Sequence, residues 1–336
     1  MEKLKQIRAN HGMTQEQLAE MLKTTQQTIA RWETGKSEPN IAALKDLAVI
    51  FGTSVDDLLG QNPLSSSDEV TTNRYHFFAG SNEGFWGHLG LRVPGATKST
   101  WYPITAGEAA RINNQACNVS DESPWIVATT LNNRALVINA KAIKKLSILD
   151  DDADEPADDW ELDWDSYNGY PQEIYKAIDD YAVGAYEEED SSEAFKATIE
   201  DIIKENDVSQ DLLYERLRVT RVHYRDGSAD TWYIDDEVSW TLFSTVELDR
   251  ESLTFDLSCK DQGLDIYVSQ DQVAVIDMPL HAMTAAAKRE LETLRAEEAE
   301  DATKAALEVA SAASRVRTKS GTRTAVRAKK APKPKG

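Results

Sequence analysis

The sequence has only two cysteines, and this scarcity limits the chemistry that it supports. Cys117 and Cys259 lie far apart, so they form neither a disulfide framework nor the CxxC pairs of a zinc site. We expect both to be small buried side chains. The five histidines also stand singly, without a ligand partner three or four residues away. A metal site is therefore not expected.

Long apolar runs are absent as well. No segment contains the roughly 18 uninterrupted apolar residues that a membrane span needs, and the opening MEKLKQIRAN lacks the apolar stretch of a signal peptide. The chain also has no P-loop, GxGxxG or GxSxG motif. We therefore expect a cytoplasmic protein that has no membrane partner, no cofactor and no enzymatic activity.

Charge is abundant but unevenly distributed. The formal net charge is -21 over 336 residues, and ten acidic residues fall between positions 150 and 165 with no basic residue among them. By contrast, residues 315–336 contain nine basic residues and no acidic one. Residues 1–62 carry seven basic and eight acidic side chains and are nearly neutral. The first segment is thus freer to approach an anion than the total charge indicates.

Five short helical patterns follow one another between residues 3 and 60. Apolar residues recur at helical spacing, which predicts that each helix buries one face; these residues are Leu4, Ile7, Leu18, Leu22, Ile29, Trp32, Leu44, Leu47, Ala48 and Phe51. Thr14 and Gln17 are spaced as a capping box at a helix start. Gly35 suits the left-handed residue after a helix end, and Pro39 prevents the helix from continuing.

The second and third of these helices have the spacing of a helix-turn-helix. The first helix would run from Gln15 to Leu22, and a three-residue turn would join it to a second helix that starts near Gln26. The small Ala19 would let the two helices cross closely. In such a unit the second helix enters the DNA major groove and its first residues reach base edges. Gln26, Gln27 and Arg31 occupy those positions. Gln pairs with adenine and Arg with guanine through two hydrogen bonds each.

With these features together, residues 3–60 resemble the Xre and phage repressor/Cro family of DNA-binding domains. The stretch TTQQTIARWETGKSEP is similar to the recognition helix of lambdoid phage repressors, and LKDLAVIFGTSVDDLL also fits. The resemblance covers about a sixth of the chain and implies an all-α, five-helix, lambda-repressor-like fold in a bacterial or phage protein associated with the nucleoid. Some relatives have an amide in place of Arg31, so their target sequence does not transfer.

The resemblance also implies roles for individual residues. Base contacts would come from Gln26, Gln27 and Arg31. An ion pair between Arg8 and Glu33 would brace the first helix against the third. Phosphate contacts would come from the following residues: Gln15, Thr25, Lys36 and Ser37.

After a linker at residues 63–73, two series of short β-prone runs are separated by an acidic, helical segment. The first series spans residues 74–150, the acidic segment 151–216 and the second series 217–278. The triplet TWY occurs in both series, at residues 100–102 and 231–233, which raises the hypothesis of a duplicated sheet unit.

The C-terminal part has a different pattern. Residues 279–314 are expected to form a helix that begins at Pro279 and carries an apolar stripe at Leu280, Met283, Ala287, Leu291 and Leu294. Residues 315–336 predict a disordered basic tail.

Several features have two interpretations. The bond between Ala79 and Gly80 resembles the cleavage site of repressors that carry a serine peptidase, but no matching Ser and Lys follow, which favours an ordinary loop. The tryptophans Trp101, Trp125, Trp232 and Trp240 either line a pocket or, as is commoner in β-rich runs, belong to the core. The acidic segment is either solvated or binds the tail, a basic partner or RNA polymerase. The tail either solubilises the chain or grips DNA without sequence preference.

The sequence therefore predicts a multidomain α+β protein. Its helix-turn-helix domain (residues 1–62) precedes a β-rich, duplicated region and a helical, basic C-terminal part. We expect a sequence-specific transcriptional regulator, a repressor by default, that binds double-stranded DNA as a homodimer. The β-rich region would bind a protein partner or a small effector. Two alternatives stay open: an antitoxin that neutralises a toxin and controls its own promoter, and a nucleoid- or plasmid-organising protein.

Overall fold

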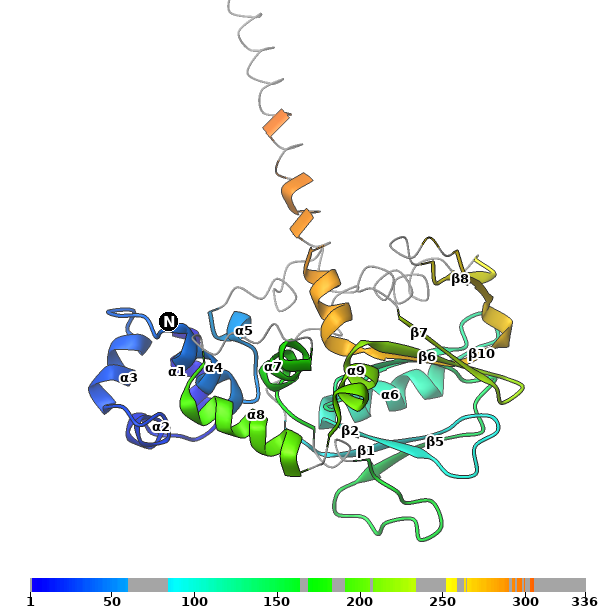
Figure 1. The fold of residues 1–336 in the computed structure, drawn as a ribbon, viewed down its shortest axis with the longest axis horizontal. Helices are drawn as coiled ribbons and strands as arrows, with labels where there is room; N and C mark the ends of the chain where they lie inside the picture. Colours follow the sequence, from blue (N-terminus) through cyan, green and yellow to red (C-terminus); the bar gives the residue numbers. More distant parts are fainter. Residues whose placement is uncertain are drawn as a thin grey trace, which may run out of the picture. The chain divides into compact units, whose positions relative to one another are not determined.

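The computed structural model of the chain describes residues 2–59, 84–163, 169–182, 191–205, 208–233, 252–258, 263, 265–289 and individual residues between 292 and 304. The chain divides into two compact units, Met1–Lys288 and Arg289–Gly336. The linker at 63–73, the Ala79–Gly80 bond, Cys259, Trp240 and the tail at 315–336 lie outside the described residues. The first unit carries the elements discussed below (Figure 1).

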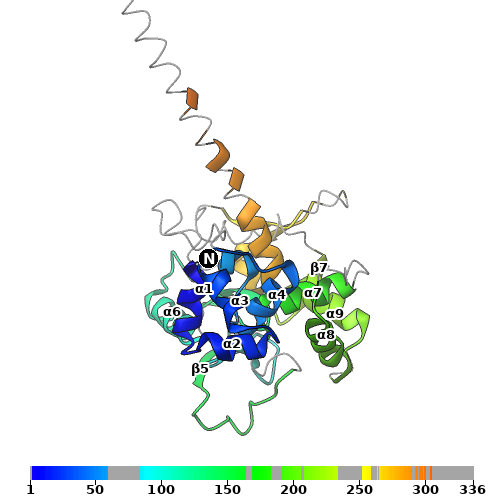
Figure 2. The same cartoon turned by 90° about the vertical axis from the view of Figure 1, so that its left-hand side faces the viewer.

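Residues 2–59 form a cluster of five helices, which Figure 2 shows facing the viewer. They are α1 (Glu2–Asn10), α2 (Gln15–Met21), α3 (Gln26–Glu33), α4 (Ile41–Ile50) and α5 (Val55–Leu59). The apolar residues expected to form the core are buried, including Leu4, Leu18, Ile29 and Leu47 at 0% exposure, whereas Leu22 is only partly buried. The helical periodicity therefore identified the buried face of each longer helix correctly.

The predicted capping signals of this helical domain are confirmed. Thr14 accepts a hydrogen bond from the Gln17 backbone N–H at 3.1 Å, and the Gln17 side chain accepts one from the Thr14 N–H at 2.8 Å. These two bonds satisfy backbone donors that have no partner within the helix. Gly35 follows α3 with a φ of 69°, a conformation that glycine adopts without steric cost.

Two antiparallel sheets lie beyond residue 84. The first has the strand order β2-β1-β5 and the second the order β3-β4-β10-β6-β7; a separate hairpin pairs β8 with β9. The strands are β1 (Gly87–Arg92), β2 (Thr100–Ile104), β3 (Trp125–Thr129), β4 (Arg134–Asn139), β5 (Lys145–Asp150), β6 (Val219–Tyr224), β7 (Ala229–Tyr233), β8 (Thr254–Asp256), β9 (Tyr267–Ser269) and β10 (Val273–Pro279); the short 3-10 helix η5 (Gln270–Gln272) precedes β10.

The strand pairing does not follow the two sequence series. β10 pairs with β4 on one side and with β6 on the other, so the larger sheet combines strands from both. The strands of residues 74–150 and those of residues 217–278 were expected to form two separate β units, but they pair with each other in one sheet. The two TWY triplets fall on β2 and β7, which are edge strands of different sheets. The duplication hypothesis gains no support from this topology.

A helix that the sequence reading missed, α6 (Ala106–Asn118), packs in the core shared by both sheets. Thr105 caps it by accepting a hydrogen bond from the Glu108 N–H at 3.1 Å, and Thr105 and Glu108 have the spacing of a capping box. Its apolar residues Ala109 and Ile112 are buried among strand residues of the two sheets. On the same helix Cys117 is exposed, so the expectation of a buried thiol was wrong.

Three helices follow the acidic stretch and share another hydrophobic core: α7 (Gln172–Ala182), α8 (Glu193–Glu205) and α9 (Gln210–Arg218). Val49 of α4 packs against this core, so the first helical cluster contacts α7. After β10, residues 280–289 are helical. Pro279 is the last residue of β10 rather than the first of that helix. Leu280, Met283 and Ala287 are buried as predicted, while Leu291 and Leu294 lie outside the described residues.

Candidate nucleic-acid interface

The turn between α2 and α3 brings the two helices into direct contact. The Thr24 N–H donates to the Ala19 carbonyl at 2.8 Å, and Ala19 is buried. Lys23 in the turn has a φ of 51°, the left-handed conformation that reverses the chain between the helices. Thr25 then begins α3, because its side chain accepts a hydrogen bond from the Thr28 N–H at 3.2 Å. The expected helix-turn-helix is therefore present, with small Ala19 at the crossing.

Helix α3 has one buried face and one exposed face. Ile29, Trp32 and Glu33 are buried, which fixes the rotation of the helix about its own axis. Gln26, Gln27 and Arg31 are exposed. Gln27 and Arg31 are four residues apart, so they lie on the same side of the helix, one turn from each other. Gln27 and Arg31 thus share an accessible surface opposite the face that is held in the core, and Gln26 is accessible in the first turn.

A partly buried ion pair holds α3 against α1. Arg8 Nε lies 2.5 Å from Glu33 Oε1, and Arg8 also donates to the Met13 carbonyl at 2.5 Å. Burial raises the pKa of the Glu33 carboxyl, but the hydrogen bonds from Arg8 and Gln15 outweigh it, so the pKa lies below its usual value. Glu33 therefore carries its charge near neutral pH, in the pair that the family resemblance implied.

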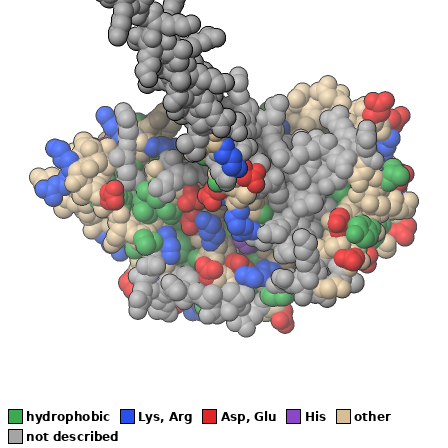
Figure 3. Space-filling model, turned by 90° about the horizontal axis from the view of Figure 1, so that it is seen from above, with side chains coloured by type: hydrophobic (Ala, Val, Ile, Leu, Met, Phe, Trp, Pro, Cys, Tyr) green, Lys and Arg blue, Asp and Glu red, His purple; other side chains and the backbone are tan. Residues whose placement is uncertain are grey.

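The residues expected to contact phosphate differ in their surroundings. Gln15 donates its side-chain amide to Glu33 Oε2 at 2.7 Å, which places it beside the ion pair and orients it. Thr25 is exposed and serves as the N-cap of α3. Lys36 is exposed and Ser37 is half-buried, both just past α3. Figure 3 shows basic side chains at its left-hand end, which is where α2 and α3 lie in Figure 1.

Comparison with known proteins agrees with this geometry. A family model described as helix-turn-helix matches residues 4–58. The SPbeta prophage-derived uncharacterized HTH-type transcriptional regulator YonR of Bacillus subtilis is 35% identical over 82 residues, 24% of this chain and 76% of that protein. The uncharacterized HTH-type transcriptional regulator MJ0272 of Methanocaldococcus jannaschii is 41% identical over 56 residues, 17% of this chain and 85% of that protein.

This chain belongs to the helix-turn-helix family.

A third relative of this helix-turn-helix protein is the HTH-type transcriptional activator BcrR of Enterococcus faecalis. It is 42% identical over 73 residues, which are 22% of this chain and 35% of BcrR. The chain therefore spans about a third of the length of this relative, and most of the helix-turn-helix protein lies outside all three matches. No solved structure matches the chain. No described helix is long and apolar enough to cross a bilayer.

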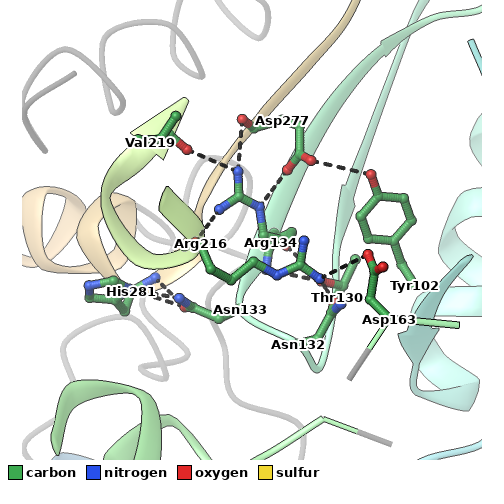
Figure 4. Close-up of polar contacts among 10 residues, drawn as sticks. All are labelled: Tyr102, Thr130, Asn132, Asn133, Arg134, Asp163, Arg216, Val219, Asp277 and His281. Carbon is green, nitrogen blue, oxygen red and sulfur yellow. Dashed lines mark hydrogen bonds and ion pairs between the residues drawn. The ribbon is translucent and has the colours of Figure 1, made fainter. Parts of the chain in front are cut away.

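Sequence reasoning missed a second polar site of this helix-turn-helix protein, which joins two strands of the larger sheet to β2 of the smaller one (Figure 4). Arg134 of β4 donates from Nε to Asp277 of β10 at 2.6 Å, and both side chains are buried. Tyr102 donates its hydroxyl to the other carboxylate oxygen at 3.2 Å, and burial together with Asp277 raises the pKa of Tyr102. These three residues are spread over 176 positions of the chain, so no local motif signals them.

Proposed function

We propose that this helix-turn-helix protein is a sequence-specific DNA-binding transcriptional regulator that places α3 in the major groove. The observation that carries the proposal is that Gln26, Gln27 and Arg31 are exposed on a helix whose Ile29, Trp32 and Glu33 are buried. Each of these side chains can form two hydrogen bonds with one base: Gln donates one and accepts one at adenine, and Arg donates both at guanine.

Phosphate contacts on both sides of α3 would set its depth in the groove. Gln15, Thr25, Lys36 and Ser37 are the proposed contacts, because they flank the base-reading residues and are all at least partly exposed. The bond from Gln15 to Glu33 and the cap made by Thr25 hold two of these side chains in place before DNA arrives. Orienting them in advance reduces the entropy lost on binding.

We further propose that the protein binds as a homodimer in the cytoplasm, since helix-turn-helix proteins generally read two half-sites about one helical turn apart. Repression is the proposed default sign, because a bound domain that excludes polymerase needs no additional contact. BcrR is named as an activator, so the sign needs its own measurement: a reporter gene behind the selected site, with and without the protein.

The decisive experiment is selection of genomic DNA fragments by the full chain, followed by affinity measurements on the selected site and on a scrambled duplex. Gln27→Ala should weaken binding to the selected site by about 1–3 kcal/mol and affect the scrambled duplex little. Gln6→Ala on α1 is the matched control, because Gln6 is also an exposed helical amide. Equal losses on both duplexes would contradict base reading by Gln27.

A further inference from the structure

The smaller sheet of this protein has an outer strand, β5, whose hydrogen-bonding edge is open. Strand β5 pairs with β1 on one side, and no described strand pairs with it on the other (Figure 1). An open edge presents N–H and C=O groups that another strand can bind. We propose that β5 pairs antiparallel with β5 of a second copy of this chain, so that the two smaller sheets join into one.

The hydrogen bonds to β1 show which backbone groups of β5 point outward. The Asp151 N–H donates to the Trp86 carbonyl at 3.2 Å, in the register of the two strands. Because bonded and non-bonded pairs alternate along an antiparallel ladder, every second residue counted back from Asp151 bonds to β1. Leu146 and Ile148 lie between those residues and direct their N–H and C=O groups away from β1. Within the described residues, no hydrogen bond reaches these groups.

The outer strand β3 of the larger sheet is closed by side chains of α6. Gln115 donates to the Val127 carbonyl at 2.9 Å and accepts from the Val127 N–H at 2.9 Å. Glu108 accepts from the Thr129 N–H at 2.7 Å. These bonds take the place of those from a neighbouring strand. The edge of β3 is therefore satisfied within the chain.

The outer strand β2 of the smaller sheet is protected in a different way. It contains Pro103, which has no N–H to donate, and the Pro103 carbonyl accepts from the Leu131 N–H at 2.7 Å. The outer strand β7 ends at Tyr233, where this range of described residues stops. Of β2, β3 and β5, only β5 lacks such protection in the described part of the chain.

The charges that flank β5 favour a second copy as the partner. Lys144 precedes the strand, Asp150 ends it, and both are exposed. If Leu146 of each copy pairs with Ile148 of the other, each of the two pairs forms two hydrogen bonds, and Lys144 lies opposite Asp150 of the second copy. A parallel arrangement would instead place like charges side by side. The charges thus select the partner and its direction, and the backbone supplies the bonds.

Pairing would also bury apolar surface. Leu146 and Ile148 pack against the core from the edge of the sheet and are only partly buried. A neighbouring strand would cover their outer sides, which adds a favourable hydrophobic contribution. The inference rests on the homodimer of the proposed function and does not depend on base reading.

The first test is sedimentation equilibrium of the full chain without DNA, over a series of protein concentrations. A reversible monomer–dimer equilibrium is expected. Ile148→Pro should weaken the dimer by about tenfold or more, because it removes an outward N–H in each copy. The ladder to β1 does not use this N–H, so the circular dichroism spectrum should match that of the wild type. Ile148→Val keeps the N–H and should leave the dimer unchanged.

A complementary pair of charge reversals guards against misfolding as an explanation. Lys144→Glu and Asp150→Lys each place like charges opposite one another twice in a dimer, so each should weaken association by about tenfold. An equimolar mixture of the two variants should dimerise nearly as tightly as the wild type, because each contact again joins an acid to a base. Lys204→Glu, at an exposed position on α8, is the matched control and should have no effect.

The outcomes separate this surface from the rest of the proposed function. A wild-type chain that stays monomeric at every concentration would overturn both the β5 interface and the homodimer. A dimer that Ile148→Pro leaves intact, or a mixture that associates as weakly as its two components, would overturn the β5 interface alone. No DNA is present, so none of these results bears on base reading by α3, and failure of the genomic selection would leave the β5 interface untouched.

Discussion

At the residue scale, Glu33 joins stability to recognition. Its carboxylate is 2% exposed and accepts hydrogen bonds from Arg8 of α1 and Gln15 of α2, while its own helix carries Gln27 and Arg31. One side chain therefore connects three helices of the DNA-binding domain. Any change in its charge is expected to alter both how firmly the domain is closed and how α3 is presented.

Glu33→Gln should destabilise the N-terminal domain by about 1–3 kcal/mol, because the partly buried Arg8 guanidinium would lose its charged partner. Hydrogen exchange followed by mass spectrometry is the suitable measurement, since it reports on α1 and α3 separately from the rest of the chain. Glu38→Gln, at an exposed acid past α3, is the control and should leave exchange unchanged. Equal protection in Glu33→Gln and wild type would show that the pair contributes no net stability.

At the element scale, the close packing of β1 against β2 depends on one glycine. Gly90 pairs with Trp101 across the two strands, and a Cβ atom at Gly90 would lie 2.6 Å from the Trp101 ring. Trp101 is 1% exposed and donates its indole N–H to the Asp159 carbonyl at 2.5 Å. The ring therefore sits between strand β1 and the acidic segment, and it has little room to move.

Gly90→Ala should cost about 1–3 kcal/mol, the usual effect of overpacking a filled core. The displaced indole would also weaken its bond to Asp159, so backbone amides near residue 159 should exchange faster. Gly84→Ala is the control, because a Cβ atom there would meet nothing within 4 Å. If Gly90→Ala left exchange near residue 159 unchanged, as Gly84→Ala should, that result would contradict the close contact between Gly90 and Trp101.

At the scale of the whole molecule, buried carboxylates make stability sensitive to acid. Burial raises the pKa of Asp159, but hydrogen bonds from Ser99 and ion pairs with Arg92 and Lys145 hold it well below the usual value. The pKa of Asp179 is also lowered: burial again opposes the shift, and its bonds to His281 and Arg218 outweigh burial. Such groups stabilise the fold above the unfolded pKa of about 4, and this contribution is lost as pH falls below it.

Unfolding in urea should therefore show a stability that is nearly constant above about pH 5 and falls from about pH 4 downward. Asp159→Asn should lower stability at neutral pH by about 1.5–3 kcal/mol, the range for a hydrogen bond to a charged group. The same variant should lose less on acidification than the wild type. A parallel acid profile in the two proteins would show that Asp159 does not contribute to the acid sensitivity.

The basic tail is also tested on the whole molecule. Deleting residues 315–336, which carry nine basic side chains, should flatten the dependence of DNA affinity on salt while leaving sequence preference unchanged. Each phosphate contact that is lost reduces the slope of log affinity against log salt by about 0.9. Fluorescence anisotropy at several salt concentrations measures this slope. An unchanged slope would favour the alternative, a tail that only keeps the chain soluble.

The sequence alone determined the local elements of this protein. Helical periodicity, the Thr14 capping box, Gly35 and the short turn defined the DNA-binding domain, because these signals act between residues a few positions apart. The exposure of Gln26, Gln27 and Arg31 followed from the same spacing. The signal for α6 was also present in Thr105 and Glu108, but the strand-like runs around it obscured it.

Only the tertiary structure decided how distant segments combine. Pairing of β10 with β4 and β6 merged two sequence series into one sheet, and Asp277 met Arg134 only because those strands are neighbours. Cys117 became exposed because α6 turns that side of the helix to solvent. Strand order and helix orientation depend on the total apolar area that a fold buries, which is summed over the whole chain and leaves no local pattern.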